Sequence, residues 1–328
     1  MKNFLLVLLT AAALALPGCK EQSQTGAAAG PLVLRIGHFP NITHVQALVA
    51  NALTRQGKGW FEQRLGPGVT IQWFNYNAGP SATEGILAGT IDMTYVGPSP
   101  AINAYARSGG QEIRIVSGAA DGGAALVVQP DENLKTPADF RGKKIATPQL
   151  GNTQDVSCRA WLTAGGLKIT QNGGDAQVIP TENPDQLALF KLKKIDAAWT
   201  VEPWVSRLEM EAGGVPIVQD KATITVLVSG AKFLAEHRDI VAKFVAAHRE
   251  LTEWIQQHPD EAQKLVEYEL NAETKGKIAP ALIAHAWNNI ILTDTVSQAG
   301  LAQFVSNAQA AGFLRQTPDL SQLIVNFQ

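Results

Sequence analysis

The sequence predicts an α/β fold with two similar lobes and a cleft between them. One pattern occurs twice: residues 80–89 with 91–98 form the first copy, and residues 184–191 with 195–203 form the second. Each copy predicts a short amphipathic helix that begins at Pro, a tight turn, a strand that opens with Ile-Asp, and a Pro that starts the next helix. Ligands of open α/β sheets bind beyond the carboxyl ends of the strands, where these loops would lie.

A second observation is the alternation of strands and helices over the first 230 residues. Short apolar runs bounded by turn residues predict strands at 32–36, 70–74, 92–96, 112–117, 124–128, 143–146, 176–179, 197–200 and 223–228. The helical spacing of apolar residues predicts helices between most of them, at 44–55, 81–88, 100–107, 153–164 and 184–192. This alternation favours βαβ units and mainly parallel sheets.

The third observation is a helical tail. Helical periodicity without strand runs predicts helices at 240–257, 259–270, 280–287 and 296–311. The apolar stretches 123–128 and 223–228 flank the second copy of the repeat, and we interpret them as two strands that cross between lobes. Lobe 1 then spans 32–122 and 228–328, lobe 2 spans 123–227, and the C-terminal helical segment packs on lobe 1. Two crossing strands form a hinge that lets the lobes close on a ligand.

The first 31 residues have the composition of an export signal and a tether. The apolar run 4–16 follows Lys2 and is too short to span a bilayer, and Leu16-Pro17-Gly18-Cys19 resembles a bacterial lipobox. We expect 1–19 to be a lipoprotein signal peptide ending at the lipidated Cys19, and 20–31 to be a flexible tether. The alternative is an ordinary secretory signal with an incidental Cys. Both predict export, and lipidation would hold the protein at the outer face of a membrane.

Composition and missing motifs exclude several classes. The chain is 45% apolar and 17% charged, as expected for a folded protein of two domains, and its net charge of −2 offers no basic surface to nucleic acid. It has no dinucleotide or phosphate-loop glycine fingerprint, nucleophile elbow or His-Glu-x-x-His, so we predict neither an enzyme nor a cofactor. Cys158 lies on the apolar side of a predicted helix, where we interpret it as a small buried hydrophobe.

Three loops are candidates for ligand contact. They span 38–44, 96–100 and 149–155, and each places Asn, Ser or Thr where a helix begins. A helix N-terminus offers unpaired N–H groups and the positive end of the dipole, so several around one cleft would hold an oxyanion without Arg or Lys. The alternative is that these residues are plain N-caps. Their position on corresponding edges of a duplicated unit favours the ligand role.

Aromatic and titratable residues near these loops suggest further contacts. Trp199 corresponds to Tyr95, and two aromatic side chains facing the cleft would clamp an apolar or planar ligand; alternatively, one or both belong to the core. Glu202 and Asp155 are candidates to meet a ligand amine, although the helix dipole equally explains Asp155. His38 is interpreted as a neutral hydrogen-bond donor to the ligand.

A metal site is not predicted. His38 and His44 are spaced six positions apart, which is poor for a shared metal on a helix, and no other His is locally paired with them.

Several blocks of the sequence together resemble one family. They are residues 34–41, residues 91–100 with their Gly97-Pro98-Ser99-Pro100 turn, residues 142–155 and residues 199–204. The chain resembles the nitrate/sulfonate/taurine-type substrate-binding proteins of bacterial ABC transporters, which are related to the synthases that make the pyrimidine precursor of thiamine. The resemblance covers roughly 32–260. It implies a periplasmic-binding-protein type II fold, a closing cleft, and delivery of the ligand to a permease driven by an ATPase.

The resemblance also implies site residues, because the first-strand loop, the Gly-Pro-Ser helix start and the second-lobe helix start line the cleft in that family. It transfers to His38, Asn41, Ser99, Asn152, Thr153, Gln154, Trp199 and Glu202. The full predicted ligand-binding set adds residues from the same loops and comprises His38, Asn41, His44, Pro98, Ser99, Gly123, Asn152, Thr153, Gln154, Asp155, Trp199 and Glu202.

The predicted function is that of an exported, monomeric solute-binding protein that closes on a small organic oxyanion, above all an aliphatic sulfonate or taurine. Sulfonate relatives commonly have a Ser-rich second-lobe loop, from which residues 152–155 depart. The alternatives are nitrate, bicarbonate, phosphonate or a pyrimidine thiamine precursor on the same scaffold, a sensory protein that docks a receptor, or a thiamine-pyrimidine synthase-like enzyme. The last is cytosolic and cysteine-dependent in the family, which the export signal and lone Cys158 argue against.

Overall fold

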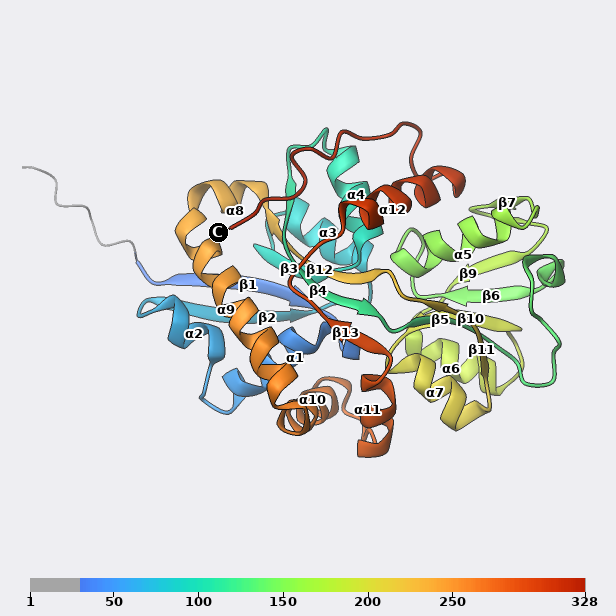
Figure 1. The fold of residues 1–328 in the computed structure, drawn as a ribbon, viewed down its shortest axis with the longest axis horizontal. Helices are drawn as coiled ribbons and strands as arrows, with labels where there is room; N and C mark the ends of the chain where they lie inside the picture. Colours follow the sequence, from blue (N-terminus) through green and yellow to red (C-terminus); the bar gives the residue numbers. More distant parts are fainter. Residues whose placement is uncertain (1–29, 328) are drawn as a thin grey trace, which may run out of the picture.

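The computed structural model describes residues 30–327, which form two lobes, each built on one β-sheet (Figure 1). Lobe 1 has a six-stranded sheet in the order β13–β4–β12–β3–β1–β2. Its strands are β1 (Leu32–His38), β2 (Val69–Asn75), β3 (Met93–Val96), β4 (Ile113–Gly122), β12 (Thr223–Gly230) and β13 (Ile290–Leu292). Lobe 2 has a five-stranded sheet in the order β11–β5–β10–β6–β9. Its strands are β5 (Ala124–Val128), β6 (Lys144–Thr147), β9 (Gln177–Pro180), β10 (Ala197–Val201) and β11 (Val215–Asp220), with β7 (Ile169–Thr170) and β8 (Gly173–Gly174) forming a separate pair.

Both sheets are mixed, so the prediction of mainly parallel sheets is wrong. In lobe 1, β1 pairs in parallel with β2 and β3, but β12 enters between β3 and β4 and is antiparallel to both. In lobe 2, β6 is parallel to β9 and β10, whereas β5 is antiparallel to β10 and β11. Strands β5 and β12 are each antiparallel to both of their neighbours. Each directly follows a link and brings the chain into its sheet from the other lobe.

Helices cover both faces of each sheet (Figure 1). In lobe 1 they are η1 (Ile42–His44), α1 (Val45–Arg55), α2 (Trp60–Leu65), α3 (Gly79–Leu87), α4 (Pro98–Arg107), α8 (Ala231–Glu236), α9 (Arg238–Gln257), α10 (Pro259–Thr274), α11 (Pro280–Trp287) and α12 (Gln298–Ala310). In lobe 2 they are η2 (Pro137–Phe140), α5 (Thr153–Ala164), α6 (Asn183–Lys191) and α7 (Trp204–Ala212). The predicted tail without strands needs a correction, since β13 pairs with β4 there. Three residues are too few for an alternating pattern to be visible in the sequence.

The lobe 1 sheet separates two apolar clusters. Leu227 of β12 packs with α1 and α9 on one face, while its neighbours Val226 and Val228 pack with α4 and α12 on the other, as the alternation of strand side chains requires. On the first face Phe61 and Phe244 stack with ring centroids 4.0 Å apart. These clusters fix the strands whose carboxyl ends reach the space between the lobes.

Two short links join the lobes. The first is at Gly122 and Gly123, between β4 and β5, where φ is +73° and +74°. This left-handed conformation suits glycine, and a Cβ on Gly123 would lie 2.6 Å from Ile290 Cγ2. The second is at residues 221–222, since β12 belongs wholly to the lobe 1 sheet. The sheets therefore divide at 222, whereas the sequence suggested 227.

The C-terminal segment packs on lobe 1, as expected, and also contacts lobe 2. Helices α9 and α10 cover α1 and α2, as expected. Helix α12 also reaches lobe 2, because Val156 of α5 belongs to the same apolar cluster as Leu301 and Phe304. The Phe313 ring lies beside Gly151, within 3.3 Å of where a Cβ would be. Closing the lobes therefore buries apolar surface as well as polar contacts.

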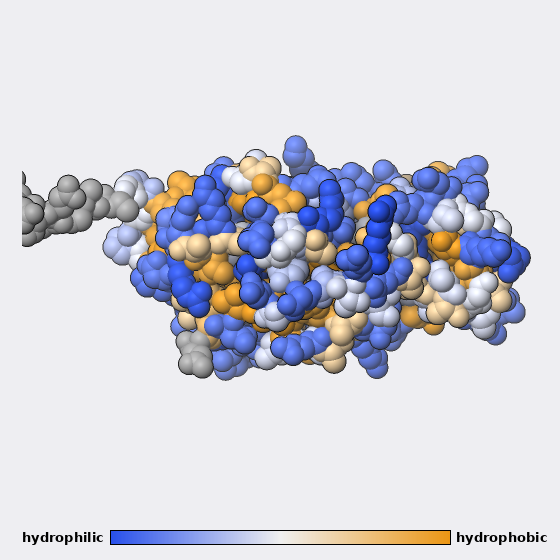
Figure 2. Space-filling model, turned by 90° about the horizontal axis from the view of Figure 1, so that it is seen from above, coloured by the Kyte–Doolittle hydropathy of each residue, from blue (hydrophilic) through white to orange (hydrophobic). Residues whose placement is uncertain are grey.

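On the face seen from above, hydrophilic residues are spread over both lobes, and smaller hydrophobic areas are scattered among these residues (Figure 2). Within residues 30–327, no helix has the length and apolar character needed to cross a membrane. The predicted signal peptide, its Cys19 and most of the predicted tether lie outside the described residues. Cys158 is fully buried in the lobe 2 core, as predicted, and burial raises the pKa of its thiol.

Candidate ligand-binding site between the lobes

A small cavity of about 30 Å³ lies between the lobes, enough for about two water molecules. Both lobes contribute to its walls. It is lined by Phe39, Asn41, Thr43, His44, Asn77, Ala78, Gly79, Gly97, Pro100, Pro148, Asn152, Thr153, Gln154, Asn183, Val201 and Ile224. None of these lining residues is Lys, Arg, Asp or Glu, so any charge in the cavity must be matched by neutral dipoles.

The N-termini of four helices supply those dipoles. Helices α3, α4, α5 and α6 all begin at the cavity, at Gly79, Gly97, Asn152 and Asn183. First-turn N–H groups lack intrahelical partners and carry the positive end of the helix dipole. The caps of α3 and α4 make no side-chain hydrogen bond that would occupy these groups. All three predicted loops contribute lining residues to the cavity, and the starts of α3 and α6 join them although they were not predicted to do so.

Prolines reduce the number of donors below what the sequence argument assumed. Pro98 and Pro100 occupy two of the first three positions of α4 and have no N–H. The remaining N–H, of Ser99, faces the Thr153 hydroxyl oxygen of the other lobe at 3.4 Å. The structure therefore places Pro98 and Ser99 at the seam between the lobes, where Ser99 and Thr153 join α4 to α5.

One lining residue of the cavity, His44, has a buried polar atom without a hydrogen-bond partner among the described residues, its Nδ1. The hydroxyl of Ser99, a residue 3% exposed, also lacks such a partner, but Ser99 does not line the cavity. Burial and the nearby charge of His38 lower the pKa of His44 well below its usual value, so its imidazole is neutral. Its ring packs against Phe39 at 4.3 Å. An unpaired buried polar atom is costly, so His44 Nδ1 points to an occupant of the cavity.

His38 is not among the residues that line this cavity. Its Nε2 is 2.9 Å from Glu273 Oε1 of α10, and both side chains are buried. The predicted contact between His38 and the ligand is therefore replaced by an internal contact. Glu273 lies 235 positions further along the chain, so nothing near His38 in the sequence indicates this partner.

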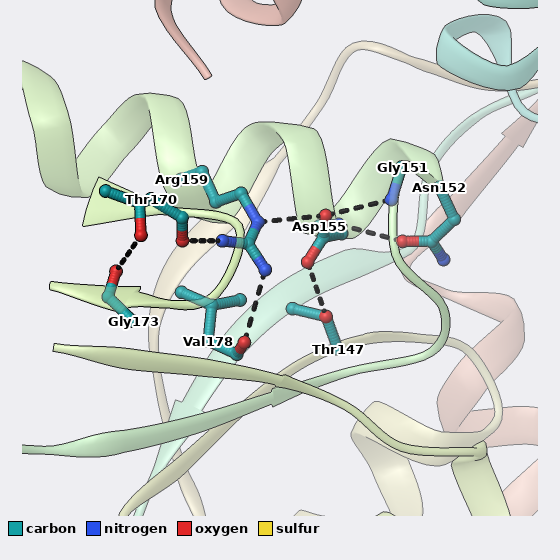
Figure 3. A network of polar contacts seen from close by, with 8 residues as sticks. All are labelled: Thr147, Gly151, Asn152, Asp155, Arg159, Thr170, Gly173 and Val178. Carbon is teal, nitrogen blue, oxygen red and sulfur yellow. Dashed lines mark hydrogen bonds and ion pairs between the residues drawn. The ribbon is translucent and has the colours of Figure 1, made fainter. Parts of the chain in front are cut away.

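The start of α5 combines lining residues with a supporting carboxylate. Asn152 caps the helix, as its Oδ1 accepts from Asp155 N–H at 2.8 Å, and its amide donates to Gln154 Oε1 at 2.9 Å. The Asp155 carboxylate points inward (Figure 3), where it accepts from the Thr147 hydroxyl, Gly151 N–H and Arg159 Nε. Asn152, Thr153 and Gln154 line the cavity as predicted, whereas Asp155 is not available to a ligand amine.

The predicted aromatic clamp is not formed. Trp199 is buried in the lobe 2 core with its ring centroid 6.1 Å from that of Trp161. Tyr95 is buried in lobe 1, and its hydroxyl lies 3.0 Å from His248 Nδ1. Neither residue lines the cavity, because both side chains pack under helices instead of extending over the strand ends. The alternative assignment of both to the core is correct.

Neither Glu202 nor Gly123 lines the cavity: Gly123 is part of the first link, and its carbonyl accepts from Glu202 N–H at 2.8 Å. The Glu202 carboxylate accepts from Asn289 Nδ2 at 2.7 Å and from Ser206 N–H at 3.1 Å, and burial raises its pKa. Its carbonyl accepts from Ile42 N–H of the other lobe at 3.0 Å. Glu202 therefore links the lobes, and the structure shows no contact from it to the cavity.

The lobes are closed over the cavity by further polar contacts. The Trp204 indole donates to Asn41 Oδ1 at 3.0 Å, and Asn77 donates to Glu182 Oε1 at 2.8 Å.

The sequence argument missed Asn183, which lines the cavity. The repeat itself could have indicated it, since Asn183-Pro184 occupies the position of Gly79-Pro80 in the first copy.

Two α/β lobes, joined by two short links and closed over a polar cavity, define a solute-binding protein of the two-lobed kind. The chain belongs to the NMT1-like family, whose model matches residues 27–270. A Bacillus subtilis (strain 168) protein, provisionally named an aliphatic sulfonates-binding protein, is 27% identical over 79% of this chain and 76% of its own length. The taurine-binding periplasmic protein of Escherichia coli (strain K12) is 26% identical over 54% of this chain and 55% of its own length.

Solved structures confirm the fold class. The alkanesulfonate-binding protein SsuA from Xanthomonas axonopodis pv. citri, bound to MOPS, superposes with a TM-score of 0.74 at 19% identity and covers 91% of this chain and 100% of its own. The periplasmic nitrate-binding protein NrtA from Synechocystis PCC 6803 superposes with a TM-score of 0.70 at 13% identity, covering 89% of this chain and 84% of its own. The predicted periplasmic-binding-protein fold is thus confirmed, and these homologues are binding proteins of transport, not enzymes.

Proposed function

We propose that the protein is the solute-binding component of an ABC importer and that it captures a small organic oxyanion, an aliphatic sulfonate or taurine, by closing its lobes. The observation that carries this proposal is the cavity at which four helix N-termini meet without one charged side chain. The names of the Bacillus subtilis, Escherichia coli and Xanthomonas proteins support the ligand class. Periplasmic relatives support export, and we propose that Cys19 carries the lipid anchor.

A sulfonate fits the donors that the cavity offers. Its three oxygens are acceptors only, and the lining residues offer N–H groups at the starts of α3 and α5, the Thr153 hydroxyl, and the amides of Asn41, Asn77 and Asn183. Hydrogen bonds to a charged group contribute about 1.5–3 kcal/mol each, more than those between neutral groups. Because donors come from both lobes, the ligand would bind the closed form more tightly and so shift the protein toward it.

A smaller anion is a second candidate, favoured by one observation. The closed cavity measures about 30 Å³, which would suit nitrate or bicarbonate better than a sulfonate with its carbon chain. We therefore propose nitrate or bicarbonate as the alternative headgroup on the same donors.

Calorimetric titration of the purified protein with methanesulfonate, taurine, nitrate and bicarbonate tests the proposal. Thr153→Val removes a cavity hydroxyl and keeps the shape, so it should weaken anion binding about tenfold, or roughly 1.4 kcal/mol. Thr163→Val in the same helix is the matched control, since Thr163 does not line the cavity. Binding of nitrate alone would favour the alternative. No anion binding, or equal effects of the two variants, would refute the oxyanion proposal.

A further inference from the structure

A second and larger space opens beside the cavity. It measures about 630 Å³, a volume typical of small-molecule sites. Lobe 1 contributes the loop after β1, the end of β2 and the chain from the end of α10 into α11, and lobe 2 contributes the first turn of α6 and the length of α7. We call this space the body groove, because its position relative to the cavity suggests which part of a ligand it holds.

The body groove adjoins the cavity at three amide side chains. Asn41, Asn77 and Asn183 line both spaces. Two of them hold cross-lobe hydrogen bonds, Asn41 to the Trp204 indole and Asn77 to Glu182. A ligand that reaches from one space to the other would pass these amides, and their bonds can rearrange as the lobes open and close.

Both lobes contribute apolar side chains to the body groove. Met210 and Trp204 come from lobe 2, and Ile278, Ala279 and Leu282 come from lobe 1. The charged side chains of the groove are mostly engaged elsewhere. Arg207 Nε lies 2.7 Å from Glu211 Oε1, Glu273 contacts His38, and Glu182 accepts from Asn77, which leaves Lys277 on the exposed rim. The groove is therefore suited to an uncharged body with apolar or aromatic surface.

We propose that the body groove is the subsite for the non-anionic part of the ligand, and that the preferred ligand is an oxyanion with an extended apolar or aromatic body. This proposal rests on the proposed function, since it places the oxyanion head in the cavity. It resolves the mismatch between a cavity of about 30 Å³ and an organic ligand, because only the head has to fit there. It also assigns specificity for the body to Trp204, Met210 and Leu282.

The test compares methanesulfonate, hexanesulfonate and naphthalene-2-sulfonate by calorimetry on the purified protein. Each buried methylene should tighten binding up to about fourfold, so hexanesulfonate should bind at least tenfold more tightly than methanesulfonate. Ala279→Trp fills the groove from lobe 1 at an exposed position and should weaken both long ligands at least fivefold. Met210→Glu, which adds a charge from lobe 2, should do the same. Methanesulfonate is too short to reach the groove and should bind equally to all forms.

Ala302→Trp, at an exposed position on α12, is the matched control and should change no affinity. Affinities that do not depend on chain length and do not respond to either groove variant would overturn the inference. If methanesulfonate still binds and needs Thr153, the proposed function survives that result. If neutral 2-naphthol binds as tightly as naphthalene-2-sulfonate and both respond to Ala279→Trp, the groove is a site for apolar molecules and the oxyanion function is refuted.

Discussion

The Asp155 carboxylate and the Arg159 guanidinium form an ion pair across one turn of α5, with Nε 3.0 Å from Oδ2 and neither side chain more than 1% exposed. Arg159 also donates to the carbonyls of Thr170 and Val178, and Asp155 holds Gly151 N–H and the Thr147 hydroxyl (Figure 3). The pair thus ties the loop before α5 to β6 and β9. It positions the neighbouring cavity residues without touching the cavity.

Breaking this pair should destabilise the protein strongly. Arg159→Ala leaves a buried carboxylate without its cation, which should lower the free energy of unfolding by about 3–5 kcal/mol. Urea denaturation measures the loss. Lys191→Ala is the control, because Lys191 is 42% exposed in its pair with Glu211 and should contribute less than about 1 kcal/mol. Equal losses in the two variants would contradict the buried-pair interpretation.

The buried His248 should make stability depend on pH. Burial lowers its pKa to about 4, and it sits between the Gly118 carbonyl and the Tyr95 hydroxyl. Unfolded His titrates near 6.5, so between about pH 6.5 and 4 the unfolded state binds more protons and stability falls as pH falls. Above about pH 6.5 His248 is neutral in both the folded and the unfolded state, so no stability is lost to its protonation there. His44, whose pKa is also lowered, acts in the same direction.

His248→Gln removes that contribution. The variant should be less stable at pH 7.5, and its deficit relative to the wild type should shrink by on the order of 2 kcal/mol between pH 7.5 and 5. Urea unfolding at a series of pH values measures the deficit. His258→Gln, on an exposed residue, should parallel the wild type across the range. A deficit in His248→Gln that does not change with pH would show that His248 is not the group responsible.

Asn289 should hold the closed arrangement through Glu202. Its amide donates to Glu202 Oε1 at 2.7 Å across the hinge, and Asn289→Ala would leave one oxygen of a buried carboxylate unpaired. We expect a more open unliganded form, seen as a larger radius of gyration in solution scattering, and ligand affinity reduced about fivefold, or roughly 1 kcal/mol. Asn288→Ala changes the adjacent exposed amide and should leave both quantities unchanged. A compact Asn289→Ala protein with full affinity would rule out this role.

Gly97 should be needed for closure instead of for folding. Its φ of −69° suits any residue, but a Cβ there would lie 2.2 Å from Thr153 Oγ1 of the other lobe. Gly97→Ala should therefore reduce ligand affinity at least tenfold while the melting temperature of the unliganded protein stays within a few degrees. In a Thr153→Ala background, which lacks the clashing hydroxyl, Gly97→Ala should cause a smaller loss of affinity than it does in the wild type. Gly230→Ala, where a Cβ has room at 3.4 Å, should have no effect. An equal loss from Gly97→Ala in the two backgrounds would argue against a clash.

Sequence patterns predicted the elements that local periodicity specifies. The repeat correctly placed α3 and α6, and the helix start at Asn152 was predicted because Asn marks such a position directly, whereas α4 begins at Pro98, two residues before its predicted start. Partners distant in sequence were out of reach. Glu202 meets Asn289 across 87 positions, and the side chain of Trp199 could face a cleft or a core with the same local pattern. The role of Asp155 was accessible, since Arg159 four residues later is the spacing of a helical ion pair.

The hydrogen bond from the Trp204 indole to Asn41 has a spectroscopic consequence. Trp204 lies in lobe 2 and Asn41 in lobe 1, so separating the lobes would exchange an amide oxygen for water around the indole. Of the seven tryptophans in the chain, this one has its indole N–H bonded across the seam. Its emission should shift to the red as the lobes part and to the blue as they meet. The protein thus carries its own fluorophore for following closure in real time, without any attached dye.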